Sequence, residues 1–94
     1  MDLSFEWVPR KAAANRRKHG VSFAQAIPVF GDPLARIFDD PDHSVSEPRE
    51  LLVGHCSRRL LLVVCFVQRG DRVRIFSARR ATRQERRDYE EGTS

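Results

Sequence analysis

Long apolar runs, a signal sequence and paired cysteines are all missing from this chain of 94 residues. The longest apolar stretch, residues 60–67, is far shorter than the roughly 18 residues that cross a membrane as a helix. The first residues begin acidic and lack the cationic head and apolar segment of a signal peptide. Cys56 and Cys65 form no CxxC pair, so we expect buried, reduced thiols. These absences predict a cytoplasmic protein that does not contact a membrane.

Metal ligands at a recurring spacing are also missing. The three histidines are scattered, and only the segment from Asp39 to His43 gathers acids beside a histidine. A structural zinc site needs about four ligands at short, defined spacings. We therefore predict no metal ion and no cofactor. Repeats and low-complexity linkers are absent too, so residues 1–94 are expected to form a single domain.

What the chain does have is segregated charge. Residues 10–18 carry five basic side chains and no acid, whereas residues 32–50 carry six acids against two arginines. Residues 69–87 hold eight arginines against two acids, a net charge of +6. Such segregation indicates either a polyanionic partner or a solvated surface, and charge alone does not separate the two. The use of arginine favours phosphate, because the planar guanidinium matches phosphate oxygens.

Capping and breaking signals organise the first half of the chain. Gly20 is suited to end a helix, and residues 22–25 form a capping box that opens another. Pro28 interrupts the helical spacing that follows, because it has no N–H to donate, so the second helix must be short or kinked. The expected elements are a strand at 4–8, a helix at 10–19, this short second helix, and a strand at 34–38.

Strand signals dominate the second half. Residues 60–69 are apolar on both faces over most of their length, which predicts a central strand covered by helices on at least one side. A hairpin with residues 49–56 would set Cys65 opposite Leu51 or Leu52, which argues against a disulfide.

A tight turn then leads to a strand at 72–78, and a capping box at 82–85 opens a last helix. Apart from Tyr89, that helix has no apolar side for a core. The predicted fold class is α+β, with two N-terminal helices, an antiparallel β-meander and a polar C-terminal helix.

Several short motifs follow one another in order from about Phe5 to Gly92. They are Phe5-x-Trp7-x-Pro9-x-Lys11, Asn15-x-x-Lys18-His19-Gly20-Val21-x-Phe23, Phe30-x-Asp32, Asp42-His43, Glu47-x-Arg49, Gly54, and Arg74-Ile75-Phe76-Ser77-Ala78-Arg79-Arg80-Ala81 with Glu85 and Tyr89. Each motif alone is weak, but the ordered set resembles the BrnT toxins over nearly the whole chain.

The resemblance implies a toxin of a type II toxin–antitoxin system with a RelE-like fold. Its activity would be metal-independent RNA cleavage that arrests translation, and its substrate RNA. The implied partner is a BrnA-like antitoxin, a DNA-binding dimer that covers the toxin in a heterotetramer and represses the shared operon.

Metal-free RNA cleavage needs a base for the 2′-hydroxyl, positive charge for the phosphorane and an acid for the leaving oxygen. Arg79 is our leading candidate for the charge, ahead of Arg49 and Arg74, because it follows a strand where the chain turns into a helix. A salt-bridged surface arginine is the alternative for each.

His43, Glu47 and Lys11 are the candidates for acid and base. The acidic run before His43 would raise its pKa if the groups are close, although His43 can equally be a turn residue. Glu47 and Arg49 lie on one side of an extended segment, as an active pair or as a plain salt bridge.

Further candidates would hold RNA or a protein partner. Arg72, Arg74 and Arg80 are expected to contact RNA phosphates, and Trp7 either stacks on a base or belongs to the core. The polar last helix is expected to contact the antitoxin through Arg83, Arg86, Arg87 and Tyr89. Without catalysis, the same surface would make a nucleic-acid-binding module or a protein-interaction module.

Overall fold

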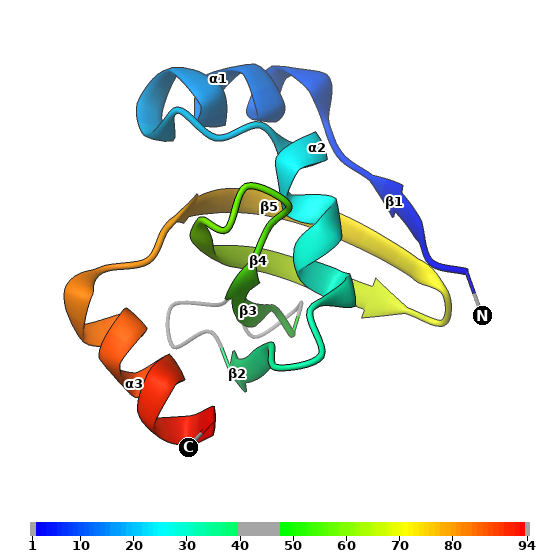
Figure 1. Cartoon of the computed structure of the whole chain (residues 1–94). Helices are drawn as coiled ribbons and strands as arrows, with labels where there is room; N and C mark the ends of the chain where they lie inside the picture. The colour runs from blue at the N-terminus through cyan, green and yellow to red at the C-terminus, as the bar shows by residue number, and fades with distance from the viewer. Residues whose placement is uncertain (1, 40–47, 94) are drawn as a thin grey trace.

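The computed structural model describes residues 2–39 and 48–93. They form one sheet with helices against both of its faces (Figure 1). In chain order the elements are β1 (Ser4–Glu6), α1 (Pro9–His19), α2 (Phe23–Ala26), the 3₁₀ helix η1 (Ile27–Gly31), β2 (Arg36–Asp39), β3 (Glu50–His55), β4 (Leu61–Arg69), β5 (Arg72–Arg80) and α3 (Arg83–Thr93).

The sheet has the strand order β1-β5-β4-β3-β2. Strands β2 to β5 form the predicted antiparallel meander, and Leu51 pairs with Cys65 as expected. The prediction of an antiparallel sheet is incomplete, however, because β1 adds to the edge of β5 in parallel and makes the sheet mixed. A parallel partner is reached only after a long crossover, so local sequence signals do not reveal it.

The N-terminal helices follow their capping signals. Gly20 ends α1 with φ 71°. This is a left-handed backbone conformation, which glycine adopts without a steric penalty. Ser22 and Gln25 cap α2 reciprocally through the predicted capping box. The α-helix stops before Pro28 and continues as η1, which confirms the expected short second helix.

Side chains of β4 alternate between two cores. Leu62, Val64 and Phe66 pack with residues of α2 and η1 on one face of the sheet. Leu61 and Val63 pack on the other face against Tyr89 of α3. The central strand is therefore covered on both sides, whereas the sequence predicted a cover on at least one side. Both cysteines are buried, and neither forms a disulfide within the described residues, as predicted.

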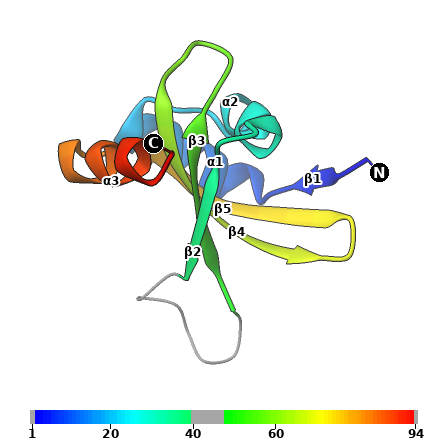
Figure 2. The same ribbon diagram turned by 60° about the horizontal axis from the view of Figure 1, so that its bottom comes forward.

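The last helix contributes one side chain, Tyr89, to the core. Tyr89 is only 4% exposed, although α3 is otherwise polar. Figure 1 and Figure 2 both place α3 on the opposite side of the molecule from β1. Among the helices described for residues 2–39 and 48–93, none has the length and apolarity to cross a membrane.

Candidate nucleic-acid interface

Strand β5 carries most of the candidate site, and α1 is fastened along its outer edge. The register of β1 reaches only from Arg72 to Arg74. Further along, Asn15 of α1 takes the place of a strand partner. Its Nδ2 donates to the carbonyl oxygen of Ala78 at 2.8 Å and to that of Val21 at 2.9 Å, while its Oδ1 accepts from the Ala78 N–H at 3.1 Å. These bonds fix α1 beside the second half of β5.

A β-bulge in β5 displays the ring of Phe76. Cys65 pairs with Ser77 and Phe66 with Ile75, so Phe76 is an extra residue between two paired positions. The ring is half-buried, and two cations lie against it. The guanidinium carbon of Arg49 is 4.1 Å from the ring centroid, and Nζ of Lys11 is 5.5 Å from it.

This group, the Phe76 cluster (Lys11, Arg49 and Phe76), joins two side chains that the sequence suggested for catalysis. Both cations lie within the roughly 6 Å at which an aromatic face attracts them. The ring therefore helps to orient positive charge next to β5. Phe76 itself was not predicted as a site residue, although its place between arginines on a strand is a usable signal.

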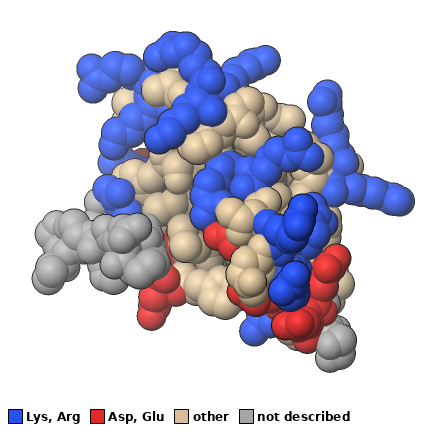
Figure 3. Space-filling model, turned by 90° about the vertical axis from the view of Figure 1, so that its left-hand side faces the viewer, with Lys and Arg blue, Asp and Glu red and all other residues tan. Residues whose placement is uncertain are grey.

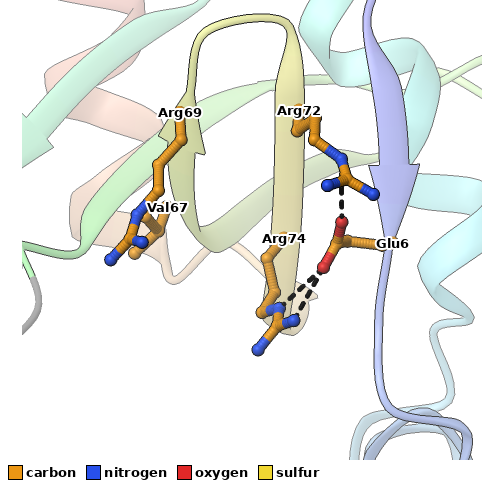
Figure 4. Close-up of a pocket in the computed structure, with 5 residues that line it drawn as sticks. All are labelled: Glu6, Val67, Arg69, Arg72 and Arg74. Carbon is orange, nitrogen blue, oxygen red and sulfur yellow. Dashed lines mark hydrogen bonds and ion pairs between the residues drawn. The ribbon is translucent and has the colours of Figure 1, made fainter.

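A second group of cations lines an arginine hollow of about 220 Å³ beside the β4–β5 turn. Figure 4 shows Glu6 of β1 between Arg72 and Arg74, with Arg69 on the neighbouring strand. Glu6 Oε2 accepts hydrogen bonds from Arg74 Nε at 3.0 Å and Nη2 at 2.7 Å, and Glu6 Oε1 lies 3.5 Å from Arg72 Nε. The hydrogen bond from Arg74 lowers the pKa of Glu6, so the carboxyl stays ionised. Val67 completes the lining.

Sequence reasoning paired Arg72 with Arg74 but missed Glu6. It is a lone acid in the strand that precedes the basic segment, which is a weak signal. Its hydrogen-bonding partner Arg74 is 68 positions away, and the parallel pairing of β1 with β5 brings them together.

Arg79 is held in an ion pair at the start of α3. Its Nη1 and Nη2 donate to the two carboxylate oxygens of Glu85 at 2.7 and 2.8 Å. Glu85 also accepts from the Thr82 N–H at 2.8 Å, and Thr82 Oγ1 accepts from the Glu85 N–H, which is the predicted capping box. The guanidinium that ranked first for catalysis therefore connects β5 to α3. A catalytic role for Arg79 stays a prediction.

The Arg79–Glu85 pair gives a testable pH dependence. The Arg79 hydrogen bonds lower the pKa of Glu85 from 4.5 to about 2. A lowered pKa stabilises the folded state fully above pH 4.5, and this stabilisation is lost as the pH falls toward 2. Since the pair is partly solvated, we expect Glu85→Gln to cost about 1–2 kcal/mol at pH 7. Urea unfolding at pH 7, 4.5 and 3 should show this difference shrinking with acid.

Glutamine still fills the capping position, so the variant isolates the charge. A wild-type advantage that is the same at all three pH values would show that the ion pair is not its source.

A polar group around Asp32 holds the second half of α3 through Tyr89. Asp32 Oδ2 accepts from the His55 N–H at 2.7 Å and from the Tyr89 hydroxyl at 3.1 Å. Burial alone would raise the pKa of Asp32, but these bonds and one from the Leu34 N–H lower it. Burial next to the Asp32 carboxylate raises the pKa of Tyr89. The backbone N–H of His55 thus helps to hold this group together.

The remaining predicted site residues are spread over the molecule. Trp7 packs edge-on against Phe23, with ring centroids 5.8 Å apart, on the face opposite the arginine hollow. Its packing supports the core interpretation. Tyr89 is buried, so a direct contact with an antitoxin would require α3 to leave the sheet. His43 and Glu47 lie outside the described residues.

The side of the molecule that carries α3 and the end of α1 is strongly basic. Figure 3 shows lysine and arginine side chains over its upper and central parts, with acids gathered near the lower edge. The exposed contributors from the two helices and the end of β5 are Arg16, Arg17, Lys18, Arg80, Arg83, Arg86 and Arg87. In residues 2–39 and 48–93, no group of three or more His, Cys, Asp or Glu side chains is placed to hold a metal ion.

Comparison with known families shows which protein family carries this interface. A family model described as the ribonuclease toxin, BrnT, of type II toxin–antitoxin systems matches residues 7–85. The chain belongs to the BrnT family. The match includes Lys11, Arg49 and Phe76, so the Phe76 cluster lies wholly within the BrnT region.

The BrnT fold is also seen in a solved structure. The 1.1 Å crystal structure of the Brucella abortus ribonuclease toxin BrnT superposes with a TM-score of 0.68 at 23% sequence identity, over 86% of this chain and 99% of that chain. No curated protein sequence matches the chain significantly.

Proposed function

We propose that this BrnT-family protein is an endoribonuclease that cleaves RNA without a metal ion and thereby inhibits translation in the cytoplasm. The observation that carries the proposal is the Phe76 cluster, where Lys11 and Arg49 meet over one ring beside the arginine hollow. Two separate groups of cations beside one strand, β5, suit a substrate with repeated negative charge.

Cleavage without a metal proceeds by attack of the 2′-oxygen on the adjacent phosphorus. The 2′-hydroxyl gives up its proton, a 2′,3′-cyclic phosphate forms, and the 5′-oxygen leaves with a proton. Negative charge builds on the phosphorane oxygens between these events. Arg49 supplies fixed positive charge at that point, because its guanidinium is oriented against Phe76.

Lys11 lies against the same ring. Of the three candidates for proton transfer, it is the one within residues 2–39 and 48–93. His43 and Glu47 remain sequence-based candidates for the same role. Arg72 and Arg74 extend the positive surface along β5, and Arg80 adds a positive charge at the other end of the strand. All three would bind flanking phosphates. Arg79 would act indirectly, because its ion pair with Glu85 keeps α3 attached next to this surface.

The partner in this proposal is a BrnA-like antitoxin, a DNA-binding dimer that joins two toxins in a heterotetramer. The exposed arginines at the start of α3, Arg83, Arg86 and Arg87, are available to it. Size-exclusion chromatography of the toxin co-expressed with the product of the neighbouring reading frame would test the complex; elution of the two proteins apart would count against it.

The activity is tested by incubating the purified protein with single-stranded RNA in excess EDTA. We expect undiminished cleavage, with products ending in a 2′,3′-cyclic phosphate, because cations of the chain supply the positive charge. Cleavage that needs an added divalent cation would contradict the metal-independent mechanism. Binding without cleavage under all conditions would instead support a nucleic-acid-binding module.

A further inference from the structure

The arginine hollow is built by three adjacent strands. Arg69 of β4 pairs in register with Arg72 of β5, and Arg74 of β5 pairs with Glu6 of β1. Residues two apart on a strand share a face, so Arg72 and Arg74 point the same way. The hollow thus gathers three guanidinium groups and one carboxylate.

Glu6 separates two cations that would otherwise repel each other. Its carboxylate engages Nε and Nη2 of Arg74 and faces Nε of Arg72. A guanidinium has five N–H donors, so both arginines retain donors for a ligand. Within residues 2–39 and 48–93, no hydrogen bond or ion pair engages the guanidinium of Arg69. The hollow therefore combines arginines held in place with one that is available.

We propose that the arginine hollow is a binding subsite for one phosphate of single-stranded RNA, next to the linkage that is cleaved, and that Glu6 is its positioning residue. This inference rests on the proposed function and adds where a flanking phosphate binds. Arg74 is two residues from Phe76 along β5, roughly 7 Å at the rise of a strand. A neighbouring phosphate of an extended RNA strand can span that distance from the Phe76 cluster.

RNA binding is measured by fluorescence anisotropy with a 2′-O-methyl oligonucleotide, which lacks the 2′-hydroxyl and is not cleaved. We expect Arg69→Ala to weaken binding about fivefold, as one charge-assisted contact is lost. The slope of log affinity against log salt should fall by about 0.7, the value for one phosphate contact on a single strand. Arg58→Ala, in the exposed β3–β4 turn, removes the same charge elsewhere and should change neither quantity.

A methylphosphonate scan locates the phosphate. Replacing linkages one at a time by the uncharged methylphosphonate should reveal one position that weakens wild-type binding but leaves Arg69→Ala unchanged. If every linkage behaves alike in the two proteins, or if Arg69→Ala matches Arg58→Ala, the inference is wrong. It is equally wrong if Arg69→Ala impairs only antitoxin binding, since the hollow would then be a protein contact.

Glu6→Gln separates positioning from charge. On charge alone, removing an acid from the hollow should tighten RNA binding, whereas loss of positioning should weaken it by about two- to fourfold. We expect weaker binding, with partial recovery in Glu6→Asp. Tighter binding by Glu6→Gln would exclude the positioning role.

Cleavage assays distinguish this inference from the proposed function. Arg69→Ala should raise KM about fivefold and leave kcat within about twofold, the pattern for lost uniform binding. If the wild type cleaves RNA but the hollow variants behave like Arg58→Ala, only the subsite is refuted. If nothing is cleaved but the methylphosphonate coupling is present, the hollow still binds one RNA phosphate, while the ribonuclease proposal and the placement beside a cleaved linkage fail.

Discussion

Replacing Arg49 with alanine should reduce kcat for RNA cleavage by about 10²–10³-fold, the usual effect of removing one charge donor to a transition state. Arg49 is the cation closest to the Phe76 ring, at 4.1 Å from its centroid. Its guanidinium is therefore oriented before substrate binds. Within residues 2–39 and 48–93, no other positively charged side chain lies this close to the Phe76 ring. Initial rates on a short RNA in EDTA, at saturating substrate, measure the effect.

Arg58→Ala is the matched control, because it removes an equal charge from an exposed turn. Circular dichroism should show the same helix and strand content in both variants. Cleavage by Arg49→Ala at the rate of Arg58→Ala would remove Arg49 from the mechanism. Arg79→Ala tests whether Arg79 is catalytic or anchors α3. A catalytic residue should mainly lower kcat in the same assay. An anchor should mainly lower the free energy of unfolding.

The largest expected effect on stability comes from Asn15. Asn15→Ala removes three hydrogen bonds and leaves both the N–H and the carbonyl group of Ala78 without a partner in a buried place. Each such group costs about 1–3 kcal/mol, so we expect a loss of about 2–4 kcal/mol in the free energy of unfolding. That is a large share of the roughly 5–15 kcal/mol that stabilises a typical domain. Urea unfolding followed by circular dichroism gives the value.

Arg16→Ala, one position along the same helix and exposed, should change the free energy of unfolding by no more than about 0.5 kcal/mol. Asn15→Asp keeps an acceptor for the Ala78 N–H but turns a carboxylate toward the Ala78 carbonyl oxygen, so it should be as destabilising as alanine. An Asn15→Ala protein as stable as Arg16→Ala would mean that α1 is held to β5 by other contacts.

Elements with local signals were predictable from the sequence. The capping boxes at Ser22 and Thr82, the helix end at Gly20 and the end of α2 before Pro28 all depend on residues a few positions apart. The meander was predictable for the same reason, since each strand pairs with the next. The partner of β1 was not, because β5 lies far along the chain, with Glu6 and Arg74 68 positions apart. The RelE-like relationship implied by the resemblance stays a prediction.

The candidate site was predictable by residue type more than by geometry. Lys11, Arg49 and Arg74 were selected from charge and motif order, and the structure places them along one stretch of β5. Glu6 and Phe76 were missed because their roles arise from a parallel pairing and from a bulge, neither of which leaves a local pattern. Arg79 was ranked first on its position at a junction, without regard to Glu85 six residues later.

The parallel pairing of β1 with β5 also has a consequence for biosynthesis. Glu6 of β1 leaves the ribosome 68 residues before its neighbour Arg74 of β5. Chains grow at about 5–20 residues per second, so β1 waits several seconds without its neighbour. Phe76 is on the same late strand, so neither group of cations is complete on a partly made chain. A ribosome making this protein is thus not exposed to the finished surface that we propose for RNA binding until β5 has been made.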